Sequence, residues 1–324
     1  MPGPIVVAGE ALMDIVVSGE DASRLRAHPG GGPYNVARTL ARLERPVRYL
    51  GCLSRDAFGI RLRDELEADG VSLANAVVTD RPTTLALATL DARGAADFAF
   101  YADGTAAPAL TPAVALGALP AELSVLHVGT LGLVFEPIAE ALEAVVNAVA
   151  DDVLVAVDPN CRPPAVKDPA AYRARMGRIT ARADLVKVSD EDLAFLSPGD
   201  TPLDAARAML ASGPAAVLIT RGENGAIVVR RDDEVAVPAR AVTVVDSIGA
   251  GDAFGGGLLA WWHAHGLKAD ELRSGEALLE ATRFASEVAA LTVERAGASP
   301  PRASNLPAEY RWPPRPQAGT SSTP

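Results

Sequence analysis

One short segment has the residue types and spacing that could carry out chemistry. It reads DSIGAGDAFGGG from Asp246 to Gly257. The β-branched run Val242–Val245 precedes it and an apolar run follows, so we predict a strand, a tight turn of small residues and then a helix. Backbone N–H groups at a helix N-terminus are unpaired, and glycine lets an anion approach them closely. The segment therefore predicts an anion hole at Gly249, Ala250 and Gly251, which would stabilise negative charge on a group in transfer.

Asp252 follows this turn directly and would lie in the first turn of the helix. The helix dipole favours its ionised form there. A carboxylate beside an anion hole can take the proton of a hydroxyl group that attacks a phosphoryl group. Two alternatives remain open, namely a simple helix cap and a dinucleotide-binding turn. The dinucleotide fingerprint fails at its third glycine, where Phe254 stands, and the chain contains no GxxxxGK[ST] sequence.

A second glycine-rich turn reads GGGPYNVAR from Gly30 to Arg38, ahead of a predicted helix over Asn35–Leu43. Asn35 offers both a donor and an acceptor, the combination that sugar hydroxyl groups need. In isolation, the pattern favours a flexible turn in which Asn35 caps the helix.

These turns must be positioned by a larger framework, and the chain alternates short β-branched runs with helical patterns. The predicted strands are Ile5–Ala8, Val47–Leu50, Val125–Val128, Val153–Asp158, Leu185–Val188 and Val217–Thr220. The predicted helices include Asn35–Leu43, Ile60–Ala68, Pro137–Ala150 and Pro202–Ala211. This alternation predicts an α/β fold, with a mainly parallel sheet between two helical layers. Ligands bind such sheets beyond the carboxyl ends of the strands, which is where the polar and glycine-rich turns fall.

Two regions depart from the alternation. Leu12–Val17 follows the first strand directly, and Thr84–Leu90 pairs with Phe98–Tyr101 in a hairpin pattern. Strands without intervening helices predict a small second sheet, placed at about residues 11–18 and 83–102, which would serve as a lid or as a dimer surface. Residues 303–324 are rich in proline, serine and threonine and are predicted to form a flexible tail.

Composition limits the classes of partner. The chain of 324 residues is 49% hydrophobic with a net charge of -11, so it can bury a full core and has no basic stripe for nucleic acid. The two cysteines, Cys52 and Cys161, form no CxxC pattern and predict free thiols in a reducing compartment. The sequence shows no leader and no membrane-spanning run, so we predict a cytoplasmic protein that binds neither nucleic acid nor membrane.

Taken together, the segments resemble the signatures of the PfkB (ribokinase-like) carbohydrate kinases, and within them the bacterial and plant fructokinases. GGGPYNVARTLARL from Gly30 resembles the first family signature, and DSIGAGDAFGGGLL from Asp246 the second. The segments GEALMD (9–14), FYADGTA (100–106), DPNCRP (158–163) and KVSDEDL (187–193) resemble the fructokinase subgroup in order and spacing. The resemblance spans residues 5–302 and implies one ribokinase-like kinase domain over residues 1–302, with a small β-sheet lid.

The resemblance implies a role for each matching residue. Asp252 would be the base, and Arg162 would contact either the ATP phosphates or a substrate carboxylate. The implied sugar contacts are Asp14, Gly31, Gly32, Asn35 and Tyr101. The implied nucleotide contacts are Lys187, Ser189, Thr220, Gly222 and Gly225. The implied ion contacts are Asp192 for Mg²⁺ and Asp246 with Ile248 for a monovalent cation such as K⁺.

The expected reaction is phosphorylation of a ketohexose by Mg-ATP, with D-fructose giving fructose 6-phosphate, in a homodimer that associates through the lid. The alternatives are a kinase of the same fold for 2-keto-3-deoxygluconate, tagatose or a nucleoside, and an inactive family member with a regulatory role.

Overall fold

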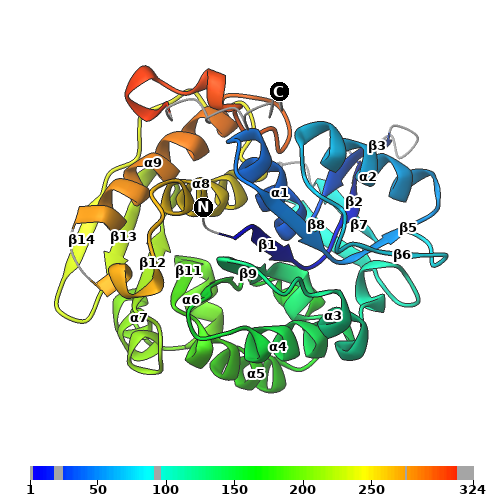
Figure 1. The fold of residues 1–324 in the computed structure, drawn as a ribbon, viewed down its shortest axis with the longest axis horizontal. Helices are drawn as coiled ribbons and strands as arrows, with labels where there is room; N and C mark the ends of the chain where they lie inside the picture. Colours follow the sequence, from blue (N-terminus) through cyan, green and yellow to red (C-terminus); the bar gives the residue numbers. More distant parts are fainter. Residues whose placement is uncertain (1–2, 18–24, 91–95, 274–275, 312–324) are drawn as a thin grey trace, which may run out of the picture.

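The structure is a computed structural model that describes residues 3–17, 25–90, 96–273 and 276–311. Its central sheet has the strand order β14-β13-β12-β11-β10-β9-β1-β4 (Figure 1). These strands are β1 (Ile5–Ala8), β4 (Val47–Leu50), β9 (Val125–Gly129), β10 (Leu154–Asp158), β11 (Leu185–Ser189), β12 (Ala216–Thr220), β13 (Ala226–Val229) and β14 (Glu234–Val237). All neighbours from β12 to β4 pair in parallel, while β13 and β14 are antiparallel. The predicted parallel sheet is confirmed, and its carboxyl edge collects the turns that follow the strands.

Helices cover both faces of this sheet, which gives the predicted three layers (Figure 1). One face packs against α1 (Gly32–Arg42), α2 (Ala57–Asp69), α8 (Ala250–Ala264) and α9 (Glu276–Val293). The other packs against α3 (Pro112–Ala118), α4 (Ile138–Ala148), α5 (Pro169–Arg182), α6 (Asp190–Leu196) and α7 (Pro202–Ala211). Because both faces are covered, the strands from β12 to β4 are almost wholly buried, as their β-branched sequences require.

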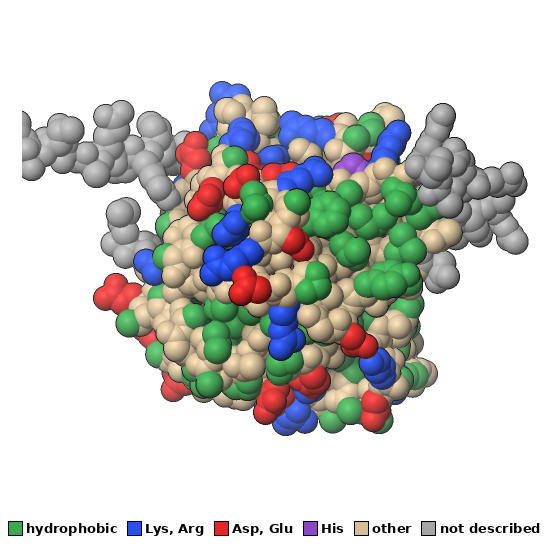
Figure 2. All heavy atoms as spheres, turned by 90° about the vertical axis from the view of Figure 1, so that its right-hand side faces the viewer, with side chains coloured by type: hydrophobic (Ala, Val, Ile, Leu, Met, Phe, Trp, Pro, Cys, Tyr) green, Lys and Arg blue, Asp and Glu red, His purple; other side chains and the backbone are tan. Residues whose placement is uncertain are grey.

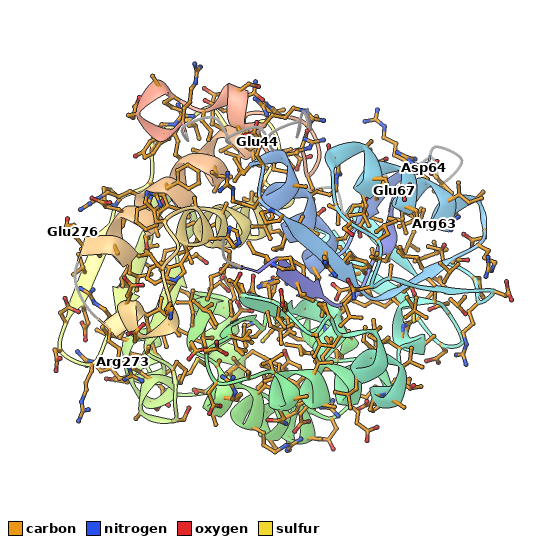
Figure 3. The ribbon with its side chains drawn as sticks, viewed as in Figure 1. Glu44, Arg63, Asp64, Glu67, Arg273 and Glu276 are labelled. Carbon is orange, nitrogen blue, oxygen red and sulfur yellow. The ribbon has the colours of Figure 1, made fainter. Side chains whose placement is uncertain are left out.

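Helix α2 illustrates how the sequence directs a helix onto the sheet. Asp56 caps its first turn by accepting a hydrogen bond from the backbone N–H of Gly59 at 2.8 Å. Leu62 and Leu66 are buried against the core, whereas Asp64 and Glu67 point away from it into solvent (Figure 3). This spacing gives the apolar stripe that a helix needs to pack on a sheet.

A second, four-stranded sheet stands beside the central one. Its strand order is β3-β2-β7-β8, and the strands are β2 (Leu12–Val17), β3 (Leu25–Gly30), β7 (Leu85–Leu90) and β8 (Ala96–Tyr101). A further pair, β5 (Cys52–Ser54) and β6 (Val77–Thr79), lies next to it (Figure 1). The predicted small sheet is therefore present, with β3 as an additional edge strand; the loop 91–94 expected at its hairpin lies outside the described residues.

Two predictions about local structure are wrong. Residues Val242–Val245 form no strand, and Val244 and Val245 are each 61% exposed, because this segment runs along the edge of α9 instead of joining the sheet. The chain also stays packed beyond residue 302, since Leu306 is buried in the core and Tyr310 packs edge-on against Phe284. Residues 312–324 lie outside the described part. No described helix has the length and apolar character needed to cross a membrane.

Candidate active site

The N-terminus of α8 lies at the carboxyl edge of the central sheet and is open. Helix α8 begins at Ala250, and its N-cap residue is Gly249, with a left-handed φ of 76° and no side chain to cap the helix. A Cβ at Gly249 would stand 2.7 Å from the Ala298 Cβ, so only glycine fits this turn. The Ala250 N–H donates to the Ser247 carbonyl oxygen at 3.3 Å, and no side chain caps the other N–H groups of this first turn, which is the arrangement that an anion site needs.

Asp252 lies in this first turn and is held by a residue from the other end of the chain. Its Oδ2 atom accepts a hydrogen bond from Asn35 Nδ2 at 2.8 Å, and both side chains are buried. Helices α1 and α8 lie side by side, which brings the two predicted glycine-rich turns together (Figure 1). The Oδ1 atom of Asn35 is buried without a hydrogen-bond partner among the described residues. A substrate hydroxyl group could satisfy it, because a buried acceptor is costly to leave unpaired.

The electrostatics of Asp252 differ from the expectation based on the helix dipole alone. Burial raises the pKa of Asp252, while the Asn35 hydrogen bond and the positive charges of Lys187 and Arg162 lower it. Desolvation is the largest of these effects, so the carboxylate is a stronger base than an exposed aspartate. This direction suits a group that must take a proton from a hydroxyl.

Asp14 belongs to the same charged cluster. Its pKa is raised to about 6, chiefly by burial and also by the charge of Asp252, against the lowering effect of the Arg162 charge. The neighbouring turn is tight, because Gly31 has a φ of 108° and a Cβ there would stand 2.7 Å from the Glu10 carbonyl oxygen. The structure therefore brings Asp14, Gly31 and Gly32 next to Asn35 and Asp252, as the sequence predicts.

Arg162 lies at the turn after β10, and no carboxylate in the described part of the chain lies within hydrogen-bond range of it. Its Nη1 atom donates to the Asn160 side chain at 2.7 Å and to the backbone oxygen atoms of Asn160 and Cys161. Asp158 and Asp184, the acidic residues with which Arg162 could form a structural ion pair, instead bond Lys187 and the Val155 N–H respectively. The charge of Arg162 acts on both Asp14 and Asp252, so it faces the site.

Lys187 lies beneath the anion hole. It is 8% exposed, and its Nζ atom bonds Asp158 Oδ2 at 2.8 Å. A Cβ on Gly251 would stand 3.1 Å from this Nζ atom, so the ammonium group lies directly against the first turn of α8. Lys187 is therefore fixed beside the predicted anion hole by its ion pair with Asp158, and its contact with the ATP phosphates stays a prediction.

Ser189 and Asp192 form the capping box of α6. Asp192 Oδ2 accepts hydrogen bonds from the Ser189 N–H at 2.8 Å and hydroxyl at 2.9 Å, and its Oδ1 accepts from the Cys161 N–H at 2.5 Å. With three donors bonded and 4% exposure, Asp192 is poorly placed for the predicted direct contact with Mg²⁺. Asp158 Oδ1 is a buried carboxylate oxygen without a hydrogen-bond partner, which an ion or an ion-bound water fits better. Among the described residues, no three His, Cys, Asp or Glu side chains form a metal-binding group.

The other predicted nucleotide residues lie along the ends of β12 and β13. Thr220 bonds the Val188 carbonyl oxygen at 3.2 Å and is half-buried. Gly222 has open space around its Cβ position, which leaves room for a ligand. Gly225 is structural, because a Cβ there would stand 2.1 Å from the Val237 carbonyl oxygen.

Asp246 connects the two segments that the resemblance associates with a monovalent cation. Its Oδ1 accepts from the Ile248 N–H at 3.0 Å and its Oδ2 from the Gly297 N–H at 2.8 Å. The Ile248 side chain is 51% exposed, so only its backbone could contribute to an ion site.

Tyr101 is the predicted sugar contact that the structure corrects. In β8 its neighbour Phe100 packs with Leu12, Ala86 and Leu131 on the side of the small sheet that faces the site. Because side chains alternate along a strand, Tyr101 points to the opposite side, where it is 58% exposed. Phe100 is therefore the aromatic residue on the site face.

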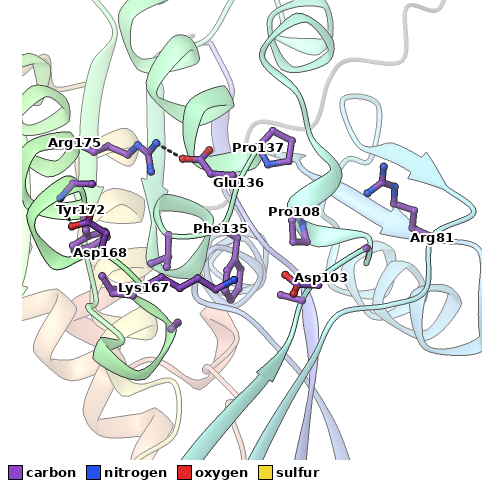
Figure 4. Close-up of a pocket in the computed structure, with 16 residues that line it drawn as sticks. Arg81, Asp103, Pro108, Phe135, Glu136, Pro137, Lys167, Asp168, Tyr172 and Arg175 are labelled. Atoms are coloured by element: carbon purple, nitrogen blue, oxygen red, sulfur yellow. Dashed lines mark hydrogen bonds and ion pairs between the residues drawn. The ribbon is translucent and has the colours of Figure 1, made fainter.

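A cavity of about 400 Å³ lies beside this site (Figure 4). Arg81, Asp103, Lys167 and the Glu136–Arg175 ion pair line it. None of the predicted site residues is among the described residues that line this cavity. The apolar cluster that contains Phe100 also contains Phe135 and Ala165 of the cavity wall, and so separates the cavity from the small-sheet face of the site.

An ionisable base beside an open helix N-terminus, within a three-layer α/β fold that carries a small second sheet, defines a ribokinase-like sugar kinase. The model of the pfkB family carbohydrate kinases matches residues 4–305, and the chain belongs to this family. A fructokinase of Rhizobium leguminosarum bv. trifolii is 37% identical over 259 residues, which cover 79% of this chain and 78% of the relative.

Solved structures agree with this assignment. The fructokinase of Xylella fastidiosa with bound ATP superposes with a TM-score of 0.83 at 30% identity, covering 91% of this chain and 93% of the other. A fructokinase double mutant of Vibrio cholerae O395, with fructose, ADP and a potassium ion bound, superposes with a TM-score of 0.80 at 27% identity, covering 91% and 94%.

Proposed function

We propose that this sugar kinase is a fructokinase that transfers the γ-phosphoryl group of ATP to the 6-hydroxyl group of D-fructose. The observation that carries the proposal is the cluster of Asp14, Asn35 and Asp252 at the open N-terminus of α8. The similarity to fructokinases over most of the chain supports fructose as the sugar.

The geometry suggests how the residues would divide the reaction. Asp14 and the free Asn35 Oδ1 would hold sugar hydroxyl groups, and Asp252 would accept the proton of the attacking hydroxyl. The N–H groups of Gly249, Ala250 and Gly251 would stabilise charge on the phosphoryl oxygen atoms during transfer. Arg162 would add positive charge on the opposite side, toward the ATP phosphates.

We propose that Mg²⁺ accompanies ATP, and that Asp158 and Asp192 are the carboxylates that would hold it, through water in the case of Asp192. When bound, the ion would neutralise charge on the phosphates. We propose a K⁺ site at Asp246 and the Ile248 backbone, supported by the potassium ion in the Vibrio cholerae fructokinase.

We propose that the small sheet closes over the sugar as a lid and also mediates a homodimer. Figure 2 shows hydrophobic side chains gathered on the side of the molecule that carries this sheet. Leu25 and Tyr101, on its two edge strands, are 57% and 58% exposed, which is typical of residues that a partner covers.

We propose a cytoplasmic location. Cys52 and Cys161 are both free and buried, as expected for a protein of a reducing compartment.

The proposed reaction is tested by ADP release from Mg-ATP across a panel of fructose, tagatose, 2-keto-3-deoxygluconate and a nucleoside. We expect kcat/KM to be highest for fructose. Of the two basic side chains whose charge acts on Asp252, Lys187 is paired with Asp158 and Arg162 is proposed to face the ATP phosphates, which leaves neither for a substrate carboxylate. A higher kcat/KM for 2-keto-3-deoxygluconate would assign Arg162 to a substrate carboxylate and overturn fructose as the substrate. No stimulation by any of these compounds would favour the inactive, regulatory alternative.

The pH dependence of sugar binding gives a second test. Asp14 would accept the stronger, charge-assisted hydrogen bonds from sugar hydroxyl groups only when ionised, and its pKa is raised to about 6. We therefore expect kcat/KM for fructose to fall as the pH drops below about 6, where an exposed aspartate would still be ionised. Asp14→Asn should raise KM for fructose by a factor of about ten, one lost hydrogen-bond partner, and change the acid limb. An acid limb identical in the two proteins would contradict this role.

A further inference from the structure

Glu10 is a buried acidic residue to which the reaction above assigns no task. It follows β1 at the carboxyl edge of the central sheet and is 1% exposed. A carboxylate in such a position is costly unless it meets several donors, so its presence there requires a reason.

The Glu10 side chain joins the starts of two elements. Its Oε1 atom accepts from the Gly32 N–H at 3.1 Å, and its Oε2 accepts from the Gly132 N–H at 2.7 Å. Gly32 is the first residue of α1, and Gly132 lies in the short 3₁₀ helix over Thr130–Leu133, directly after β9. One carboxylate thus links the sugar-binding turn to the end of the strand that pairs with β1.

The chemistry of the contact requires a carboxylate in particular. The N-cap of α1 is Gly31, which has no side chain, so Glu10 satisfies an N–H group of that helix from a distance. Two N–H donors approach two different oxygen atoms, and an amide in place of the carboxylate would direct an NH₂ group at one of them. Three residues further along α1, Asn35 holds Asp252.

Charged and titratable groups surround Glu10 on several elements. The pKa of Glu10 is raised to about 8, chiefly by burial and also by the charge of Asp252, although hydrogen bonds from the backbone N–H groups of Glu10, Gly132 and Gly32 lower it. The charge of Glu10 in turn raises the pKa of Tyr49 on β4, whose hydroxyl group donates to the Gly9 carbonyl oxygen. The charges of Glu10 and of Asp252, the proposed base, therefore interact.

We infer that Glu10 is a positioning residue that clamps the start of α1 to the Thr130–Leu133 turn and so fixes Asn35 for sugar binding. This inference rests on the proposed function for its sugar substrate. The nucleotide side of the site is built from β11, β12 and the α8 N-terminus, and does not depend on this clamp.

The test compares Glu10→Gln with Asp184→Asn. Asp184 is a matched control, because it is also a partly buried carboxylate that accepts a backbone N–H, that of Val155 at 2.8 Å, and it lies directly before β11, at the opposite edge of the sheet. Both variants are compared with wild type at about pH 9, where Glu10 is ionised. There we expect KM for fructose in Glu10→Gln to rise on the order of tenfold, the contribution of one charge-assisted hydrogen bond, with KM for ATP unchanged. Asp184→Asn should leave both KM values unchanged. Equal KM values for fructose in Glu10→Gln and wild type, or equal increases in both variants, would overturn the inference.

Two further readouts keep the test decisive. In the wild type, ionised Glu10 accepts both N–H groups, so KM for fructose should decrease as the pH rises through about 8; a KM that is constant there would count against the clamp even if the variant does not fold. Hydrogen exchange of residues 31–36 and 130–134 should be faster in Glu10→Gln and unchanged in Asp184→Asn. This comparison needs no substrate, so it still tests the clamp if no sugar is phosphorylated and the proposed function fails.

Discussion

Asp252→Asn is expected to lower kcat by a factor of about 100 to 10,000, the usual range for a positioned base. The asparagine keeps the size of the side chain and one oxygen atom that can accept from Asn35 Nδ2, but it cannot take the proton of the attacking hydroxyl group. KM for ATP should change little, since the N–H groups at the start of α8 and the neighbouring glycine turns are unaltered. Steady-state kinetics with saturating fructose and varied ATP would measure both quantities.

Asp168→Asn is the matched control for this variant. Asp168 is the N-cap of α5 and accepts hydrogen bonds from the Ala170 and Ala171 N–H groups at 3.0 Å each. If Asp252 were only a helix cap, the two substitutions would have similar small effects on kcat. We expect kcat of Asp168→Asn to remain within about twofold of wild type, since asparagine caps a helix about as well as aspartate.

Asn35→Asp should be nearly as damaging, through a different physical effect. It places a second carboxylate within hydrogen-bond distance of Asp252, because the present Nδ2–Oδ2 distance is 2.8 Å. Two buried carboxylates this close share one proton, and burial already raises the pKa of Asp252. At pH 7 the pair would retain its proton, and kcat should fall on the order of 100-fold, a factor of ten for each unit by which the pKa exceeds the pH.

The pH profile separates this effect from simple loss of a contact. In Asn35→Asp, kcat should recover as the pH is raised from 7 to 9, because the shared proton is then released. Asn35→Ala removes the donor without adding a charge, so its kcat should show no such recovery and its KM for fructose should rise instead. Parallel pH profiles for the two variants would show that proton sharing is not the cause.

The main strands and the paired glycine turns could be predicted because their signals are local. Ile5–Ala8 and Pro202–Ala211 have the bounds expected from sequence, since a buried strand and a capped helix carry their own patterns. Strand β3 was not predicted, because LRAHPG contains a proline and no apolar alternation, and only pairing with β2 makes it a strand. Val242–Val245 has the composition of a strand but no neighbouring strand to pair with.

Some site residues could likewise be predicted from their neighbours in sequence, whereas others depend on contacts that only the fold creates. The position of Asp252 in the first turn of a helix could be predicted from a few neighbouring residues, whereas the local pattern at Asn35 favours a helix cap and only the resemblance implies a sugar contact. Glu10 and the Lys187–Asp158 pair depend on which groups the fold brings near them, and a lone acidic residue after a strand gives no signal of two N–H donors elsewhere in the chain. The face occupied by Tyr101 depends on the register of β8 against β7, which one residue of slip would reverse.

The position of β1 has a consequence for how the chain acquires its structure during synthesis. This strand pairs on one side with β4 and on the other with β9, so Ile5 lies next to both Val47 and Val125. The N-terminal strand therefore cannot complete its pairing until more than a third of the chain has left the ribosome, and the Asn35–Asp252 bond must wait until more than three quarters of the chain has been made. Contacts this distant in sequence form slowly and leave apolar strands unpaired in the meantime. We expect an arrested chain that ends before α8 to aggregate and to lack sugar binding, even though it contains the complete first glycine-rich turn.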